Sequence, residues 1–152
     1  MRYLIAIAAV AGVAGAAAPP AIEVHATCAT TVALDAATRT AHTDRLRTVL
    51  VAAFRDVPSD ARFGVDASIA KLDVRPSART VEIRAEVHLV LSDAQRRIQW
   101  MGTSGATVSV PAASYRRAEL PALQREAVEH ATRELVGPVR QRLTRSTDYR
   151  GS

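Results

Sequence analysis

The chain's four histidines are its most versatile candidates for metal binding and acid–base chemistry. Two imidazoles bind one metal when they lie three or four residues apart on a helix, or two apart on a strand. No pair in this sequence has such a spacing, so we predict no metal site and no cofactor, and we interpret His88 and His130 as surface residues. The histidines are His25, His42, His88 and His130.

Glu82 and Glu86 are the carboxylates whose spacing comes nearest to that of a hydrolase pair. On a strand both point to the same face, but about 13 Å apart, which exceeds the separation used by retaining or inverting glycosidases. Arg84 lies between them. The three residues therefore indicate a solvated charge ladder rather than a catalytic pair.

No nucleophile motif is evident either. Ser104 and Ser109 lie outside any nucleophile elbow, and the segment Gly102–Gly105 is not followed by the lysine and helix of a phosphate-binding loop. We therefore predict no catalytic residues and lean towards a protein that is not an enzyme. A hydrolase whose site is assembled from residues distant in sequence stays open as an alternative.

The chain is basic, with a formal net charge of +5, and Lys71 is its only lysine. A solvated basic face is one interpretation of the clustered arginines. The other is contact with anionic envelope polymers or lipid headgroups, driven by long-range attraction that salt would weaken. The residues assigned to this contact are Arg116, Arg117, Arg140, Arg142 and Arg145.

The first residues have the form of a secretory signal peptide: Met1-Arg2-Tyr3, then an apolar run that ends in small residues before Pro19-Pro20. We assign residues 1–26 to it, with cleavage between 16 and 26. The run is too rich in alanine, and too short, for a spanning helix, so we do not expect an integral membrane protein. We predict export to a periplasm or to the medium, where nucleic acid is not an expected partner.

Cys28 is the only cysteine, so the chain can form no internal disulfide. In an oxidising compartment its thiol could pair with another chain. A lipid-bearing first residue is a further alternative, but His25-Ala26-Thr27 lacks the leucine and the small residue that such a cleavage site requires. A cysteine near a frayed terminus is the simplest interpretation.

The segment Val81–Val110 predicts two long strands folded onto each other, because apolar residues alternate with polar ones along it. Only Val90 breaks the alternation of the first strand. A loop over Ser92–Gln95 would set Leu89 opposite Ile98 and Val87 opposite Trp100, with all four facing the core. We also expect the second strand to bend or bulge near Gly102.

The other segments predict a strand at Thr30–Asp35, an amphipathic helix from about Thr40 to Asp56, and a strand at Phe63–Val74 with a bulge near Ala70. A second helix starts near Glu119 and stops or kinks at Gly137-Pro138. The fold class is therefore α+β: a two-layer sandwich in the order β-α-β-β-β-α, with an antiparallel sheet and two helices on one face. Residues 27–144 form one domain, and residues 145–152 a flexible tail.

A family resemblance is carried by the phrase Ala67–Leu72, by a long strand that ends at Leu91-Ser92-Asp93-Ala94, and by Ile98 and Trp100 after the turn. These features resemble the envelope lipoproteins that activate penicillin-binding proteins, and the related curli-secretion and TolB amino-terminal domains. In those families a glycine follows the aspartate of the turn, where this chain has Arg96 or Arg97. The resemblance implies a non-catalytic envelope domain of the α/β sandwich type and carries over no functional residues.

The sequence is consistent with three functions. The first is an exported, non-enzymatic accessory domain that binds another envelope protein through the solvent-exposed face of the sheet or through an edge strand. The second is the exported hydrolase named above, which a pocket joining His88 or His130 to an acid and a nucleophile would favour. The third is a binder of a small apolar ligand between sheet and helices, which requires a cavity there.

Overall fold

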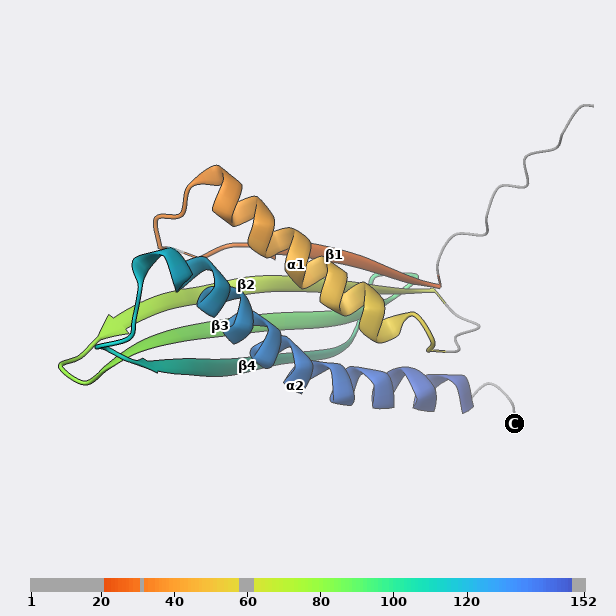
Figure 1. Cartoon of the computed structure of the whole chain (residues 1–152). Helices are drawn as coiled ribbons and strands as arrows, with labels where there is room; N and C mark the ends of the chain where they lie inside the picture. The colour runs from red at the N-terminus through yellow and green to blue at the C-terminus, as the bar shows by residue number, and fades with distance from the viewer. Residues whose placement is uncertain (1–20, 31, 58–61, 149–152) are drawn as a thin grey trace, which may run out of the picture.

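The computed structural model describes residues 21–30, 32–57 and 62–148, and most of the predicted signal peptide lies outside these ranges. The described residues form one four-stranded sheet with two helices packed on the same face of it (Figure 1). The elements, in chain order, are β1 (Ile22–Cys28), α1 (Ala36–Phe54), β2 (Phe63–Pro76), β3 (Thr80–Asp93), β4 (Ile98–Pro111), a short 3-10 turn η1 (Arg117–Glu119) and α2 (Leu120–Asp148).

The predicted two-layer α+β fold and its β-α-β-β-β-α order are confirmed. Within the sheet the strands follow chain order, β1-β2-β3-β4, and α1 lies over β1 while α2 lies over β3 and β4. The prediction of a wholly antiparallel sheet is wrong for the first pair, because β1 runs parallel to β2 with Ile22 opposite Phe63. The sheet is therefore mixed. Among the described residues, no helix has the length and apolar character needed to cross a membrane.

The first strand lies earlier in the chain than predicted. Residues 30–35 form no strand; instead Asp35 caps α1, where its Oδ1 accepts a hydrogen bond of 2.8 Å from the Thr38 amide. The strand is Ile22–Cys28, in which Val24 and Cys28 face the core while Glu23 and His25 are exposed. A domain boundary at residue 27 would cut this strand, so the folded domain begins before it.

The alternation of β3 is confirmed: its odd residues from Val81 to Leu91 are buried against the helices. The predicted bulge in β2 is also confirmed, because the pairing with β3 shifts between Ile69 and Lys71. The extra residue returns Leu72, which has 0% exposure, to the same face as Ile69.

The register predicted for the β3–β4 hairpin is wrong. Leu89 pairs with Gly102, and Trp100 pairs with Leu91, because β3 continues to Asp93 and the turn lies over residues 94–97, later in the chain than the predicted loop over residues 92–95. The backbone carbonyl of Asp93 accepts a hydrogen bond of 2.9 Å from the Arg96 amide, and Arg96 has a φ of 60°, which is the left-handed conformation. The ladder shifts between Leu91 and Ser92, not at Gly102.

The second helix is longer than predicted. It continues through Pro138 to Asp148, so the flexible tail predicted from residue 145 is helical as far as 148. Val139 and Leu143, beyond the proline, are both fully buried. Their burial extends the apolar stripe of α2 and stabilises the last turns despite the lost amide donor.

Candidate functional site

His88 and His130, the two histidines named for the hydrolase hypothesis, each lie beside a carboxylate. His88 Nε2 is 3.0 Å from Glu86 Oε1 on the open face of the sheet, with Ser68 and Thr103 opposite it on the neighbouring strands. His130 is 3.9 Å from Glu126 on α2. Neither histidine lines a pocket found among the described residues, so the hydrolase hypothesis gains no support from them.

No group of three or more His, Cys, Asp or Glu side chains within the described ranges is arranged to hold a metal ion. Cys28 is buried at the end of β1, and its carbonyl accepts a 2.9 Å bond from Arg39 Nη1. A lipidated Cys28 at the amino terminus would require the loss of Ile22–Thr27, which supplies most of β1.

His42 is the one histidine in the core, with 1% exposure between α1 and α2. Its Nε2 is 3.3 Å from Gln124 Oε1, and its Nδ1 is buried with no hydrogen-bond partner. Burial lowers the pKa of His42, and the charge of Arg125 lowers it further, against the opposing effect of the hydrogen bond that His42 donates to Gln124 Oε1. His42 is therefore a neutral packing residue at neutral pH.

The arginines predicted to contact anionic surfaces lie at opposite ends of α2. Arg116 and Arg117 precede it, and about 30 Å of helix separates Leu120 from Arg140. Arg140 donates a 2.7 Å bond to the Ala53 carbonyl in the last turn of α1, and Arg116 bonds to backbone carbonyls of its own turn. The five residues therefore do not form one patch.

The open face of the sheet carries an apolar cluster at its hairpin end. Val90 and Met101 are cross-strand partners, and Ile98 lies next to them opposite Ser92. Met101 is 65% exposed and Ile98 61% exposed, the two highest values among the large apolar side chains that the structure describes. We call Val90, Ile98 and Met101 the open-face cluster.

Val90 and Ile98 of this cluster also line a shallow hollow of about 600 Å³. Its remaining lining is mostly polar: Glu23 and His25 from β1, Asp66 from β2, and Arg62 and Arg96 from the adjoining turns, among others. An apolar centre with a charged rim is the usual anatomy of a protein-binding surface. Methionine is enriched at such surfaces because its flexible side chain fits varied partners.

The hairpin that positions Ile98 is held by Asp93. Its Oδ1 accepts bonds from the amides of Gln95 and Arg97, at 2.9 and 3.0 Å, and its Oδ2 binds the Arg97 guanidinium at 2.8 Å. The hydrogen bond from the Arg97 amide, with the guanidinium, lowers the pKa of Asp93. The carboxylate stays charged and fixes the turn.

The sequence contained the signal for the open-face cluster. Val90 breaks the alternation of its strand, and Met101 is an apolar residue at a position of polar parity on the next strand. The two are directly opposite each other. The predicted register hid this relationship, because it placed Val87 opposite Trp100 and turned Ile98 towards the core.

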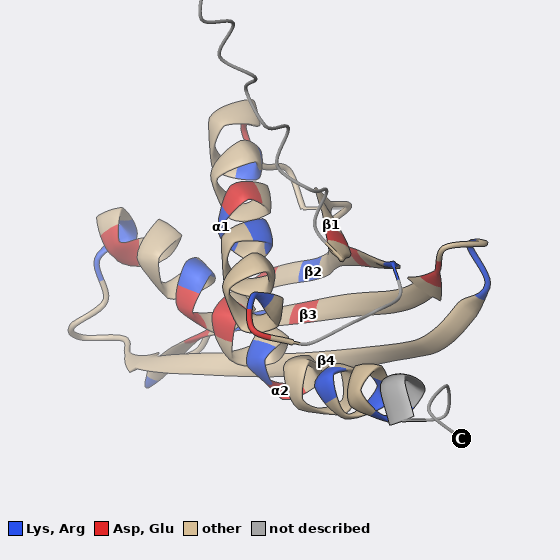
Figure 2. Ribbon diagram, turned by 90° about the vertical axis from the view of Figure 1, so that its right-hand side faces the viewer, with Lys and Arg blue, Asp and Glu red and all other residues tan. Residues whose placement is uncertain are grey.

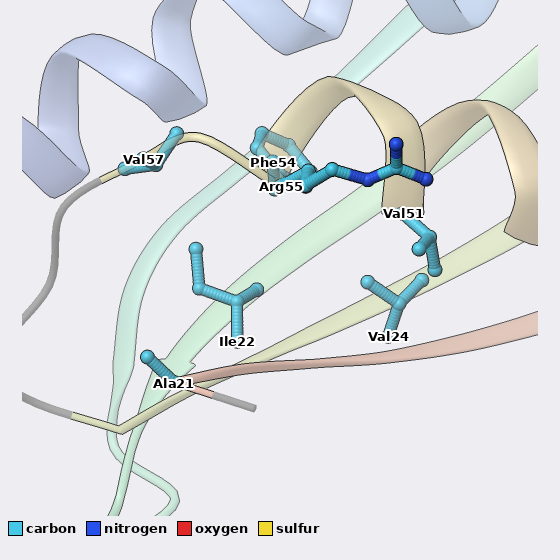
Figure 3. A pocket seen from close by; sticks show the side chains of 7 residues that line it. All are labelled: Ala21, Ile22, Val24, Val51, Phe54, Arg55 and Val57. Atoms are coloured by element: carbon cyan, nitrogen blue, oxygen red, sulfur yellow. The ribbon is translucent and has the colours of Figure 1, made fainter. Parts of the chain in front are cut away.

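A smaller apolar pocket, of about 260 Å³, lies between β1 and the end of α1 (Figure 3). Ile22 and Val24 of β1 face Val51 and Phe54 of α1 across it, and Arg55 extends along its rim. This is the position expected for an apolar ligand between sheet and helix. It lies at the edge of the layer, and the deeper core residues close the interior.

A third hollow, of about 460 Å³, lies on the outer surface between the two helices. Glu129 of α2 crosses to α1 there: its Oε1 is 2.6 Å from Arg45 Nε, while its Oε2 is 3.0 Å from Arg133. The Arg45 hydrogen bond lowers the pKa of Glu129. These bonds satisfy the charges at the helix contact, so we interpret this hollow as structural.

Comparison with known proteins finds similarity at the level of fold. No protein-family model matches the chain, and a search of curated proteins gives no match. The fold resembles that of a DUF330-family protein from Xanthomonas campestris, with 20% identity and a TM-score of 0.51, over 70% of this chain and 65% of that one. The chain therefore spans slightly less than two thirds of that protein.

Two further structures match over most of their length. A minor lipoprotein from Acinetobacter baumannii has a TM-score of 0.52 at 14% identity, over 77% of this chain and 94% of that one. A hypothetical protein from Chlamydia trachomatis has a TM-score of 0.52 at 13% identity, over 80% of this chain and 96% of that one. The chain thus has a fold found in several solved bacterial proteins, one of them named a lipoprotein.

Proposed function

We propose that this chain is an exported, non-enzymatic accessory domain of the cell envelope that binds another protein through the open-face cluster. The apolar leader supports export to a periplasm or beyond. The shared fold with a protein named a minor lipoprotein supports an envelope location, as does the resemblance of the Asp93 turn to the penicillin-binding-protein activators, curli-secretion lipoproteins and TolB amino-terminal domains.

The single observation that carries the protein-binding role is the exposure of Ile98 and Met101 on a sheet face that no helix covers. The rest of that face is polar, with Glu82, Arg84 and His88 exposed along β3. When a partner covers such a surface, its charged rim stays in contact with solvent, and burial of the apolar centre supplies the binding energy.

The test is a photo-crosslinking amino acid placed at Met101 in cells, with the same amino acid at Arg84 as the matched control. Arg84 lies on the same face, six residues along β3 from Val90, or about 20 Å away. We expect a heavier adduct from position 101 that is absent from position 84 and lost when Ile98→Asp is added. Equal adducts from both positions, or none from position 101, would contradict the proposal.

A second candidate, contact with an anionic polymer or lipid headgroup, is favoured by the arginines at the hairpin end. Arg142 and Arg145 are exposed on the last turns of α2, and Arg140 joins this helix to the end of α1. We expect binding to anionic vesicles at low salt to weaken for the Arg142→Gln/Arg145→Gln variant and to persist for Arg116→Gln/Arg117→Gln. Retention of binding by the first variant would exclude this candidate.

A further inference from the structure

The free edge of β4 is an uncharged strand. Its 14 residues, Ile98–Pro111, contain no Lys, Arg, Asp or Glu, although 23% of the whole chain is charged. The neighbouring strands of the same length each carry several charges, such as Asp66 and Lys71 in β2 and Glu82 and Arg84 in β3. The absence of charge along β4 is visible as an unbroken tan ribbon (Figure 2).

β4 is also an edge strand of the sheet. Within the part of the chain that the structure describes, its only strand neighbour is β3, and no hydrogen bond there reaches the backbone of Trp100–Val110 from the other side. The ladder with β3 is regular from Trp100 to Val110, without a bulge or a proline. Proteins ordinarily protect such an edge with charges, prolines, bulges or short length. This edge lacks all four along eleven residues.

The opposite edge of the sheet is protected. β1 has seven residues, carries Glu23, and ends where the chain turns towards α1. Of the two edges, β4 is therefore the one at which pairing with a further strand is not prevented.

We propose that β4 pairs antiparallel with β4 of a second copy of this chain, so that two sheets join into one across a two-fold axis. Antiparallel pairing of a strand with itself is isologous and closed, so it stops at a dimer. Because the chain has a net charge of +5, self-association is opposed wherever arginines meet. β4 itself contributes no charged side chain to such a contact.

The side chains of β4 suit such a pairing. Thr103, Thr107 and Val108 are strand formers, and cross-strand pairs of threonine and valine are favourable. The carboxylate that reaches β4 from α2, that of Glu134, is already bound by Ser104 Oγ at 2.5 Å.

Pairing of two strands lies at the small end of stable interfaces, which bury about 1,200 Å² or more. We therefore expect a dimer that dissociates on dilution through the micromolar range. Because Met101 lies in β4, the two proposals are distinguished by the mass of the adduct from position 101: twice the mass of the chain reports β4 pairing, and any other mass reports a different protein.

The test uses the chain purified in the form in which it accumulates in its cells. Its mass in solution is measured by sedimentation equilibrium over a range of concentrations. We expect a monomer–dimer equilibrium for the native chain, a monomer for Thr103→Lys/Thr107→Lys, and an unchanged dimer for Thr27→Lys. Thr27 is the matched control, an exposed threonine on the opposite edge strand. Circular dichroism confirms that each variant is folded.

A second measurement on the native chain does not depend on any variant. Hydrogen exchange of the amides in Trp100–Val110 should slow as the concentration rises, while exchange in Ile22–Cys28 should stay constant. A monomer at the highest concentration, a dimer that survives Thr103→Lys/Thr107→Lys, or a monomer whose β4 edge instead captures a different protein would each overturn the proposal.

Discussion

The indole of Trp100 lies across Gly102 on the same face of β4. A Cβ atom built on Gly102 would stand 2.4 Å from Cη2 and 2.6 Å from Cζ2 of that indole. Real Cβ atoms do not approach ring carbons so closely, so the glycine is required by the tryptophan and not by a bulge. The large ring packs against the backbone because the residue two positions along the strand has no side chain.

Gly102→Ala should therefore destabilise the fold. Moving the indole off the strand costs about 1–3 kcal/mol, the usual range for overpacking a core, and should also shift the tryptophan fluorescence. Gly105→Ala is the control, because its Cβ would meet nothing nearer than the Ala85 carbonyl, at 3.6 Å. Urea unfolding measures both variants, and equal stability losses would contradict the assigned contact.

Arg96→Gly should leave the stability unchanged or raise it by up to about 1 kcal/mol. Arginine at a φ of 60° carries the steric cost of the left-handed region, whereas glycine adopts this conformation freely but loses more entropy on folding. Arg97→Gly is the matched control and should destabilise the fold, since it removes the guanidinium bonds to Asp93 and adds the entropy cost of a glycine. A larger loss for Arg96→Gly than for Arg97→Gly in urea unfolding would refute this.

The stability of the fold should fall as the pH drops through the ordinary histidine pKa of 6.5. Because burial lowers the pKa of His42 in the folded state, the unfolded chain binds the proton more readily, and acid favours unfolding. His42→Gln should reduce the loss between about pH 7.5 and about pH 5.5. His88→Gln, at an exposed histidine, should retain most of it. The readout is the free energy of unfolding in urea at each pH, and an identical pH dependence in native chain and His42→Gln would contradict the assignment.

Cleavage of the leader should occur before Ile22, because β1 begins there. Mass spectrometry of the accumulated chain gives the mature amino terminus, and an end within Ile22–Cys28 would contradict the role of β1. A chain shortened to begin at Thr27 should be markedly less stable, since it loses the parallel pairing with β2 and the buried Val24.

The sequence predicted those elements whose pattern is local. The alternation from Val81 to Leu91 and the parity change near Ala70 both follow from a period of two residues, and both are confirmed. Ile22–Cys28 has the same alternation, but it adjoins an apolar leader, and the predicted leader includes its first residues, 22–26. The pattern identifies a strand without showing where a preceding segment ends.

The errors arose where a tertiary contact or a backbone conformation decides the outcome. The hairpin register depends on the left-handed conformation of Arg96, which a non-glycine residue rarely adopts. Helix α2 continues past Pro138 because Val139 and Leu143 find a buried surface. The open-face cluster depends on that register, so it could not be located until the turn was known.

The parallel pairing of Ile22 with Phe63 has a consequence for the order of folding. The strands β2, β3 and β4 are joined by short turns and can pair with their neighbours as local hairpins. In contrast, β1 can pair with β2 only after the whole of α1 and the start of β2 have been synthesised. As the chain leaves a ribosome or a translocation pore, its first strand thus has no strand partner until Phe63 has emerged. A processing peptidase that acts in this interval meets β1 before it is paired.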